Sequence, residues 1–103
     1  MEYCSVYVTA GTEEEAAGIG RTLIEERLAA CVNILPANSI YRWEDTVEQD
    51  SEVVMFVKTR SSFSEKVIER IKSLHSYEVP CIVVLPIQQG NPDYLQWIEE
   101  STR

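Results

Sequence analysis

Two segments of the chain have the apolar spacing of an amphipathic helix, and their positions among segments of strand character restrict the fold more than any other sequence feature. The helical segments are residues 12–30 and 62–75, and each begins with the Thr/Ser-x-x-Glu sequence of a capping box. The segments of strand character are rich in branched and aromatic side chains; they are residues 3–10, 32–41, 52–60 and 81–86.

The resulting order, β-α-β-β-α-β, predicts a ferredoxin-like α+β sandwich with right-handed crossovers. An additional C-terminal helix is expected after Gly90, because Asn91 is a good N-cap and Pro92 suits the first turn. A chain of 103 residues is long enough for one hydrophobic core, so residues 1–103 are expected to form a single domain.

The predicted strands differ in how their apolar residues are spaced. Residues 3–10 alternate apolar and polar side chains, which is typical of a half-buried strand. Residues 53–57 are apolar on both faces, so helices are expected to cover one side and another subunit the other. Residues 81–86 form a continuous apolar run, which predicts a central strand. Pro36 places the second strand at an edge or at a bulge.

Net charge and cysteine spacing restrict the partners and the compartment expected of the chain. Nine Lys and Arg residues oppose seventeen Asp and Glu residues, which gives a formal net charge of -8. Nucleic acid and anionic membrane surfaces would repel such a chain, so neither is expected as a partner. Three widely spaced cysteines, with no signal-peptide pattern and no long apolar run, favour a cytoplasmic protein.

Few residues of the sequence are suited to catalysis. His75 is the only histidine, and one histidine among many carboxylates is no signature of a Ser-His-Asp triad. Gly18 and Gly20 are similar to the start of a dinucleotide fingerprint, but the third glycine is missing and both fall inside a predicted helix. We therefore expect no enzymatic activity and no required cofactor.

The junction between the second helix and the last strand carries three types of metal ligand, namely His75, Glu78 and Cys81. His75 and Glu78 share a helix face if the helix continues for one more turn, and Cys81 joins them only if the loop folds back. The structural alternative makes His75 a helix C-cap, Glu78 a solvated charge and Cys81 a core thiol. Both interpretations remain open at this point.

Two pairs of aromatic residues are candidates for contacts between subunits. Tyr41 and Trp43 lie near the end of a long predicted hairpin, where a single domain has little to pack against them. Tyr94 and Trp97 lie on the apolar face of the last helix. Aromatic residues are enriched at interface centres, which favours an oligomer contact, and the alternative is a local aromatic lid over the chain's own core.

Five stretches of the sequence together resemble the CutA divalent-cation-tolerance family over essentially the full chain: RLAACVN at 27–33, YRWE at 41–44, KTR at 58–60, HSYEVP at 75–80 and GNPDYLQWI at 90–98. The resemblance implies a ferredoxin-like subunit and a tightly packed homotrimer similar in plan to the PII signalling proteins. It also implies a cytoplasmic location and a link to copper and other divalent cations. It implies no known enzymatic reaction.

Two positions depart from the sequences that are common in that family. Ser76 and Cys81 stand where relatives commonly have a proline and a second glutamate. The Cys81 thiol is a softer ligand than a carboxylate and favours Cu(I) or Zn over Mg.

The function expected from these observations is that of a non-catalytic homotrimer that binds divalent cations, including copper, weakly and acts in cation tolerance. The alternative is a PII-like sensor that binds a small anionic metabolite in clefts between subunits. In that case Lys58 and Arg60 would supply the positive charge, because phosphate groups need converging donors.

Overall fold

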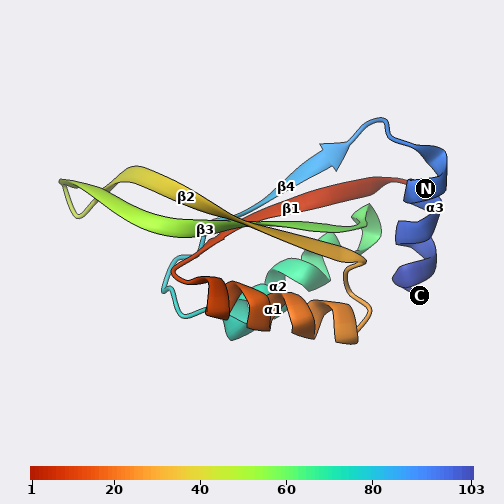
Figure 1. Ribbon diagram of the computed structural model, residues 1–103, viewed down its shortest axis with the longest axis horizontal. Helices are drawn as coiled ribbons and strands as arrows, with labels where there is room; N and C mark the ends of the chain where they lie inside the picture. Colours follow the sequence, from red (N-terminus) through yellow and green to blue (C-terminus); the bar gives the residue numbers. More distant parts are fainter.

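The computed structural model describes residues 1–103 and contains one four-stranded antiparallel sheet with three helices (Figure 1). The strand order is β2-β3-β1-β4, and the predicted ferredoxin-like α+β class is confirmed. Along the chain the elements are β1 (Tyr3–Ala10), α1 (Glu13–Glu25), β2 (Cys31–Trp43), β3 (Thr46–Arg60), the 3-10 turn η1 (Ser61–Phe63), α2 (Ser64–Leu74), β4 (Ile82–Ile87) and α3 (Pro92–Ser101).

The hydrophobic core lies between one face of the sheet and the helices α1 and α2, which run beneath it in Figure 1. The period-two alternation of β1 directs every second side chain into this core, as the sequence predicts. Each fully buried branched side chain stabilises the fold by about 1.5–3 kcal/mol. The buried members from the sheet and helices include Val6, Val8, Met55, Val57, Ala16, Ile19, Leu23, Val67 and Ile71.

The first predicted capping box is confirmed, and the second is wrong. The Glu15 amide donates a hydrogen bond to Thr12 Oγ1 over 3.1 Å, which caps α1. Before α2 the chain already turns as the 3-10 segment η1, and the Ser61 amide donates to the carbonyl of Glu2. Ser62 therefore lies inside a turn, whereas a capping residue needs extended backbone, and α2 begins without a side-chain cap.

Helix α1 ends at Glu25, five residues before its predicted end, because Arg27 takes the left-handed conformation with φ of 59°. The Leu28 amide then donates to the carbonyl of Leu23 over 2.9 Å, closing the turn in the manner of a Schellman motif. Ala29 remains buried in the core although it is no longer helical. The apolar stripe thus continues past the helix because the following turn packs on the same core.

Strand β4 lies at an edge of the sheet beside β1, so the prediction of a central strand from its apolar run is wrong. One face of β4 is apolar although the chain itself leaves it uncovered. On the sheet face opposite the helices, Val83 and Leu85 are 48% and 43% exposed. The edge prediction for Pro36 is confirmed, because β2 forms the opposite edge.

Strands β2 and β3 continue beyond the rest of the sheet as a long twisted hairpin (Figure 1). Glu44 and Asp45 form its two-residue turn with φ of 50° and 64°, the left-handed geometry that matches the twist of paired strands. Strand β3 begins at Thr46, so residues 48–50 pair with β2, although the sequence places them before the strand.

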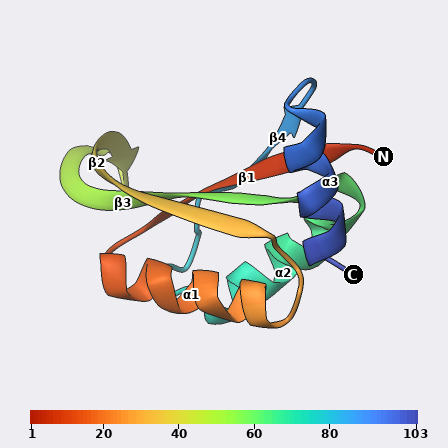
Figure 2. The ribbon, with the colours of Figure 1, turned by 45° about the vertical axis from the view of Figure 1, so that its right-hand side comes forward.

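The sheet face opposite α1 and α2 is called the open face below. Helix α3 covers only one end of this face (Figure 2), where Ile98 is buried. Arg60 fixes the helix there by donating to the Glu99 carbonyl over 2.7 Å and to Thr102 Oγ1 over 2.9 Å. None of the helices has both the length and the apolar character needed to cross a bilayer.

The left-handed residue at the end of α1 gives a test of the backbone geometry. Replacement of Arg27 by Gly should raise the free energy of unfolding by up to about 1 kcal/mol, because glycine adopts this conformation without a steric cost. Arg21→Gly, in the middle of the same helix, should lower it by about 0.5–1 kcal/mol. Chemical denaturation at one protein concentration measures both changes, and a loss of stability in Arg27→Gly would contradict the assignment.

Candidate functional site

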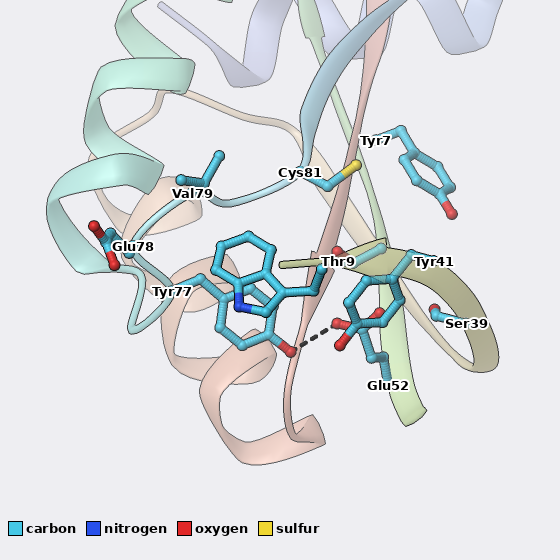
Figure 3. A pocket seen from close by; sticks show the side chains of 10 residues that line it. Tyr7, Thr9, Ser39, Tyr41, Glu52, Tyr77, Glu78, Val79 and Cys81 are labelled. Atoms are coloured by element: carbon cyan, nitrogen blue, oxygen red, sulfur yellow. Dashed lines mark hydrogen bonds between the residues drawn. The ribbon is translucent and has the colours of Figure 1, made fainter. Parts of the chain in front are cut away.

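A cavity of about 450 Å³ lies where the open face meets the loop between α2 and β4 (Figure 3). Strands β1, β2 and β3 provide one wall, and residues 77–81 of the loop provide the other. The cavity is rich in aromatic side chains and contains two carboxylates. Its lining consists of Tyr7, Thr9, Ser39, Tyr41, Trp43, Glu52, Tyr77, Glu78, Val79 and Cys81.

The backbone of Thr9, near the end of β1, holds both ends of this loop. His75 Nε2 lies 2.7 Å from the Thr9 carbonyl oxygen at the start of the loop. The Thr9 amide donates to the Cys81 carbonyl over 3.3 Å at its end. The loop is therefore attached to the sheet on both sides of Tyr77 and Glu78.

The His75 side chain is completely buried, and both of its ring nitrogens have partners. The Tyr77 amide donates to Nδ1 over 3.1 Å, while Nε2 faces a carbonyl oxygen that can only accept. These partners require the neutral ring with its proton on Nε2. Neither nitrogen has a free lone pair, so in this conformation His75 is a structural residue of the loop.

Glu15 connects the start of α1 to the same loop. Its Oε2 accepts a hydrogen bond from the Ser76 amide over 2.7 Å and lies 3.8 Å from His75 Nδ1. Partial burial pushes the pKa of Glu15 upward, but hydrogen bonds from Ser76 outweigh it and hold the pKa below its ordinary value. Glu15 is therefore ionised at neutral pH and stabilises the first turn of the loop.

Tyr77 lies across the cavity, and its hydroxyl donates to Glu52 Oε2 over 2.6 Å (Figure 3). Burial and the bond to this carboxylate raise the pKa of Tyr77, so the phenol stays protonated. Gly11 leaves room for the ring, because a Cβ at this position would stand 3.3 Å from the Tyr77 hydroxyl oxygen. The contact orients the Glu52 carboxylate inside the cavity.

Tyr41 makes a second phenol–carboxylate contact, across the hairpin. Its hydroxyl donates to Asp50, and this hydrogen bond, together with burial and nearby carboxylates, raises the pKa of Tyr41 to about 12. Tyr41 and Tyr77, two of the three phenols on the cavity wall, are consequently neutral donors whose protons point to carboxylates.

The three predicted metal ligands are not gathered into one site. No group of three or more His, Cys, Asp or Glu side chains is placed to hold a metal ion. His75 is buried with both nitrogens engaged, Cys81 is exposed on the cavity wall, and the Glu78 carboxylate points away from the aromatic side chains (Figure 3). The helix ends at Leu74, so the helical spacing that would align His75 with Glu78 does not form.

The two predicted interface pairs lie at different places on the molecule. Tyr41 and Trp43 line the cavity and are 40% and 48% exposed, so they do not close over the chain's own core as a lid. Tyr94 and Trp97 pack together on α3 with ring centroids 5.5 Å apart, and both keep exposed surface. Their role in an oligomer stays a prediction.

Sequence reasoning missed Glu52, Tyr77 and Tyr7 as cavity residues. The strand period gave one usable signal, because Glu52 and Tyr7 fall on the side of their strands that is opposite the core residues. No such signal existed for Tyr77, whose position depends on the folded loop.

The fold and the cavity define a small ferredoxin-like protein with a long hairpin and an acidic, aromatic-lined pocket. The chain belongs to the CutA1 divalent ion tolerance family, whose model, described as "CutA1 divalent ion tolerance protein", matches residues 4–101. It is 51% identical to the divalent-cation tolerance protein CutA of Thermus thermophilus over 98 residues, which are 94% of this chain and 95% of that protein.

Other relatives extend this similarity. Mouse protein CutA is 46% identical over 99 residues, but the chain covers only 56% of its length. The solved structure of the periplasmic divalent cation tolerance protein CutA from Archaeoglobus fulgidus has a TM-score of 0.96 at 42% identity, covering 98% of this chain and 99% of that one. For the Thermus thermophilus structure the TM-score is 0.94 at 49% identity, with coverage of 98% and 99%.

The structural role of His75 can be tested by stability. His75→Ala should lower the free energy of unfolding by about 2–4 kcal/mol, because the buried imidazole leaves a cavity and the Thr9 carbonyl and the Tyr77 amide each lose a hydrogen-bond partner. His75→Gln should cost less, since an amide can still donate to Thr9. Denaturant titration checks the order, and an unchanged stability in His75→Ala would refute the role.

Proposed function

We propose that the protein acts in divalent-cation tolerance by binding divalent cations, including Cu²⁺, weakly and without catalysis. The observation that carries the proposal is the cavity, whose lining includes Glu52, Glu78 and Cys81 and has no Lys or Arg. Such a lining favours a cation over an anion. The relatives whose names refer to divalent-cation tolerance support the same function.

Glu78 and Cys81 are the proposed metal-binding side chains. Glu78 accepts no hydrogen bond from the chain, and Cys81 is a free, exposed thiol, so neither must leave a partner to bind a cation. The two side chains point in different directions from the loop (Figure 3), so one chain offers a metal ion few ligands and binds it weakly. The thiol would favour Cu(I) and Zn²⁺ over Mg²⁺. We assign no metal-binding role to His75, in contrast to the sequence-based expectation, because both ring nitrogens are engaged.

Calorimetric titration with Zn²⁺ and Cu²⁺ tests this assignment. Cys81→Ser and Glu78→Gln should each weaken binding by about tenfold or more, because mutation of a residue that only supports a metal ligand already lowers metal affinity by about that factor. Glu69→Gln, on an exposed part of α2 away from the cavity, is the control and should leave the affinity unchanged. Equal affinities in all four proteins would reject the site.

We also propose that the protein is a homotrimer. The radius of gyration is 14.1 Å, whereas a compact domain of this length has about 13 Å. The accessible surface is 6603 Å², against about 5,900 Å² for a folded monomer of this mass. Large apolar side chains contribute to the exposed surface, since Leu35, Val83 and Leu85 are exposed on the open face.

The placement of the exposed aromatic residues supports a ring. Tyr41 and Trp43 lie on the hairpin, and Tyr94 and Trp97 lie on α3 near the opposite end of the sheet (Figure 1). Two different patches at opposite ends suit head-to-tail contacts, which close into a cyclic oligomer when the rotation between subunits allows it. The proposal is that each hairpin contacts the next subunit.

Sedimentation equilibrium tests the assembly. The mass should be three times the subunit mass of 11.8 kDa, and it should stay so on dilution to micromolar concentration. Trp97→Ala and Trp43→Ala should each weaken association, since aromatic anchors dominate interface energies. A monodisperse monomer of the unchanged protein would reject the trimer.

The PII-like alternative receives no support from the basic residues it requires. Arg60 is bound to Glu99 and Thr102 and stacks on Phe63, with 4.8 Å between the guanidinium carbon and the ring centroid. Lys58 Nζ lies 5.5 Å from the Tyr94 ring centroid. Both side chains are thus engaged at the α3 end of the sheet and do not line the cavity.

We propose a cytoplasmic location, as the sequence suggests. The three cysteines are unpaired, which suits a reducing compartment. Names of relatives include a chloroplastic and a periplasmic protein, so the compartment is a property to be measured for each member.

A further inference from the structure

The cavity between the open face and the 77–81 loop has features that a simple metal site does not need. Four aromatic side chains line it: Tyr7, Tyr41, Trp43 and Tyr77. Aromatic rings attract organic cations through the negative face of the π-system, whereas a small hydrated metal ion gains little from them. A volume of about 450 Å³ also falls within the range of cavities that hold small organic molecules.

Glu52 is the charged group at the centre of this aromatic lining. Its Oε2 accepts the hydrogen bond from the Tyr77 hydroxyl at 2.6 Å, and its Oε1 accepts none from the chain. The carboxylate is half-buried and has no salt-bridge partner. A partly desolvated anion without a cationic partner gains most from a ligand that carries a positive charge and an N–H donor.

The only charged groups in the cavity lining are carboxylates, and two of its three phenols already donate to carboxylates. Tyr77 directs its proton to Glu52, and Tyr41 directs its proton to Asp50. No basic side chain lines the cavity. An anionic ligand would therefore meet negative charge with no cation to balance it.

We propose that this cavity binds a small protonated amine, with the ammonium group donating to Glu52 Oε1 and the alkyl or aryl part lying against Trp43 and Tyr77. The inference goes beyond cation tolerance and does not require a metal at Glu78 and Cys81. Glu78, whose carboxylate points outward at the rim (Figure 3), supplies negative charge near the opening.

The two tryptophans provide a reporter and an internal control. Trp43 lines the cavity, whereas Trp97 packs against Tyr94 on α3. Titration of ¹⁵N-labelled protein with n-butylammonium chloride should shift the indole cross-peak of Trp43 to saturation and leave that of Trp97 in place. n-Butanol and sodium butyrate have the same chain length with a neutral and a negative head group, and neither should shift Trp43 at equal concentration.

Variants then test the role of Glu52. Glu52→Gln keeps the shape and removes the charge, and it should weaken butylammonium binding by about tenfold or more. Glu69→Gln, on an exposed part of α2 away from the cavity, changes the net charge equally and should leave the affinity as it is. An unchanged Trp97 cross-peak and melting temperature show that each variant is folded.

Several results would overturn the proposal. They are an unmoved Trp43 cross-peak, equal shifts with butanol and butyrate, equal losses in the two variants, or no loss in Glu52→Gln. An unmoved peak is also the result expected if a neighbouring subunit fills the cavity. Failure of Zn²⁺ and Cu²⁺ binding with an intact butylammonium response would reject the proposed metal function alone.

Discussion

The backbone of Thr9 is the point on which the candidate site depends. Its carbonyl accepts from His75 and its amide donates to the carbonyl of Cys81, so a single peptide region of β1 fixes both ends of the loop that follows α2. Tyr77 lies between these attachments, and its position over Gly11 brings its hydroxyl to Glu52. The histidine is thus important through its shape and its two hydrogen bonds, because the wall of the cavity exists only while the loop is held.

Residues of metal-ligand type that lie close together in the sequence do not necessarily form one metal site in the folded chain. His75, Glu78 and Cys81 are close in sequence, yet the chain leaves its helix at Leu74 and gives each side chain a different environment. One is buried with both nitrogens bonded, one is at the rim, and one is on an exposed wall. The acidic character of the cavity comes from Glu52 as well, a residue of a distant strand, and it is this combination that favours cations.

Most of the fold could be predicted from periodicity, and its exceptions have physical causes. The alternation of β1 and the stripes of α1 and α2 gave the β-α-β-β-α-β order because local spacing reflects which side faces the core. The position of β4 could not be obtained in this way, since an apolar run does not say whether its second face meets a helix, solvent or another chain. The sequence did not indicate the end of α1, because the left-handed position that follows the helix is occupied by Arg27, whereas glycine is the usual residue there. For site residues on strands, the alternation along the strand indicated weakly which face of the sheet they lie on. The position of Tyr77 depended on tertiary contacts alone.

The proline content of the two edge strands has a consequence for how the chain can associate. β2 and β4 border the sheet, and each contains one proline, Pro36 and Pro86. A proline supplies no amide hydrogen, so an incoming strand would meet a missing donor on either border. Uncontrolled growth of the sheet into fibrillar aggregates is thereby disfavoured, even though the face of the same sheet is rich in exposed apolar groups.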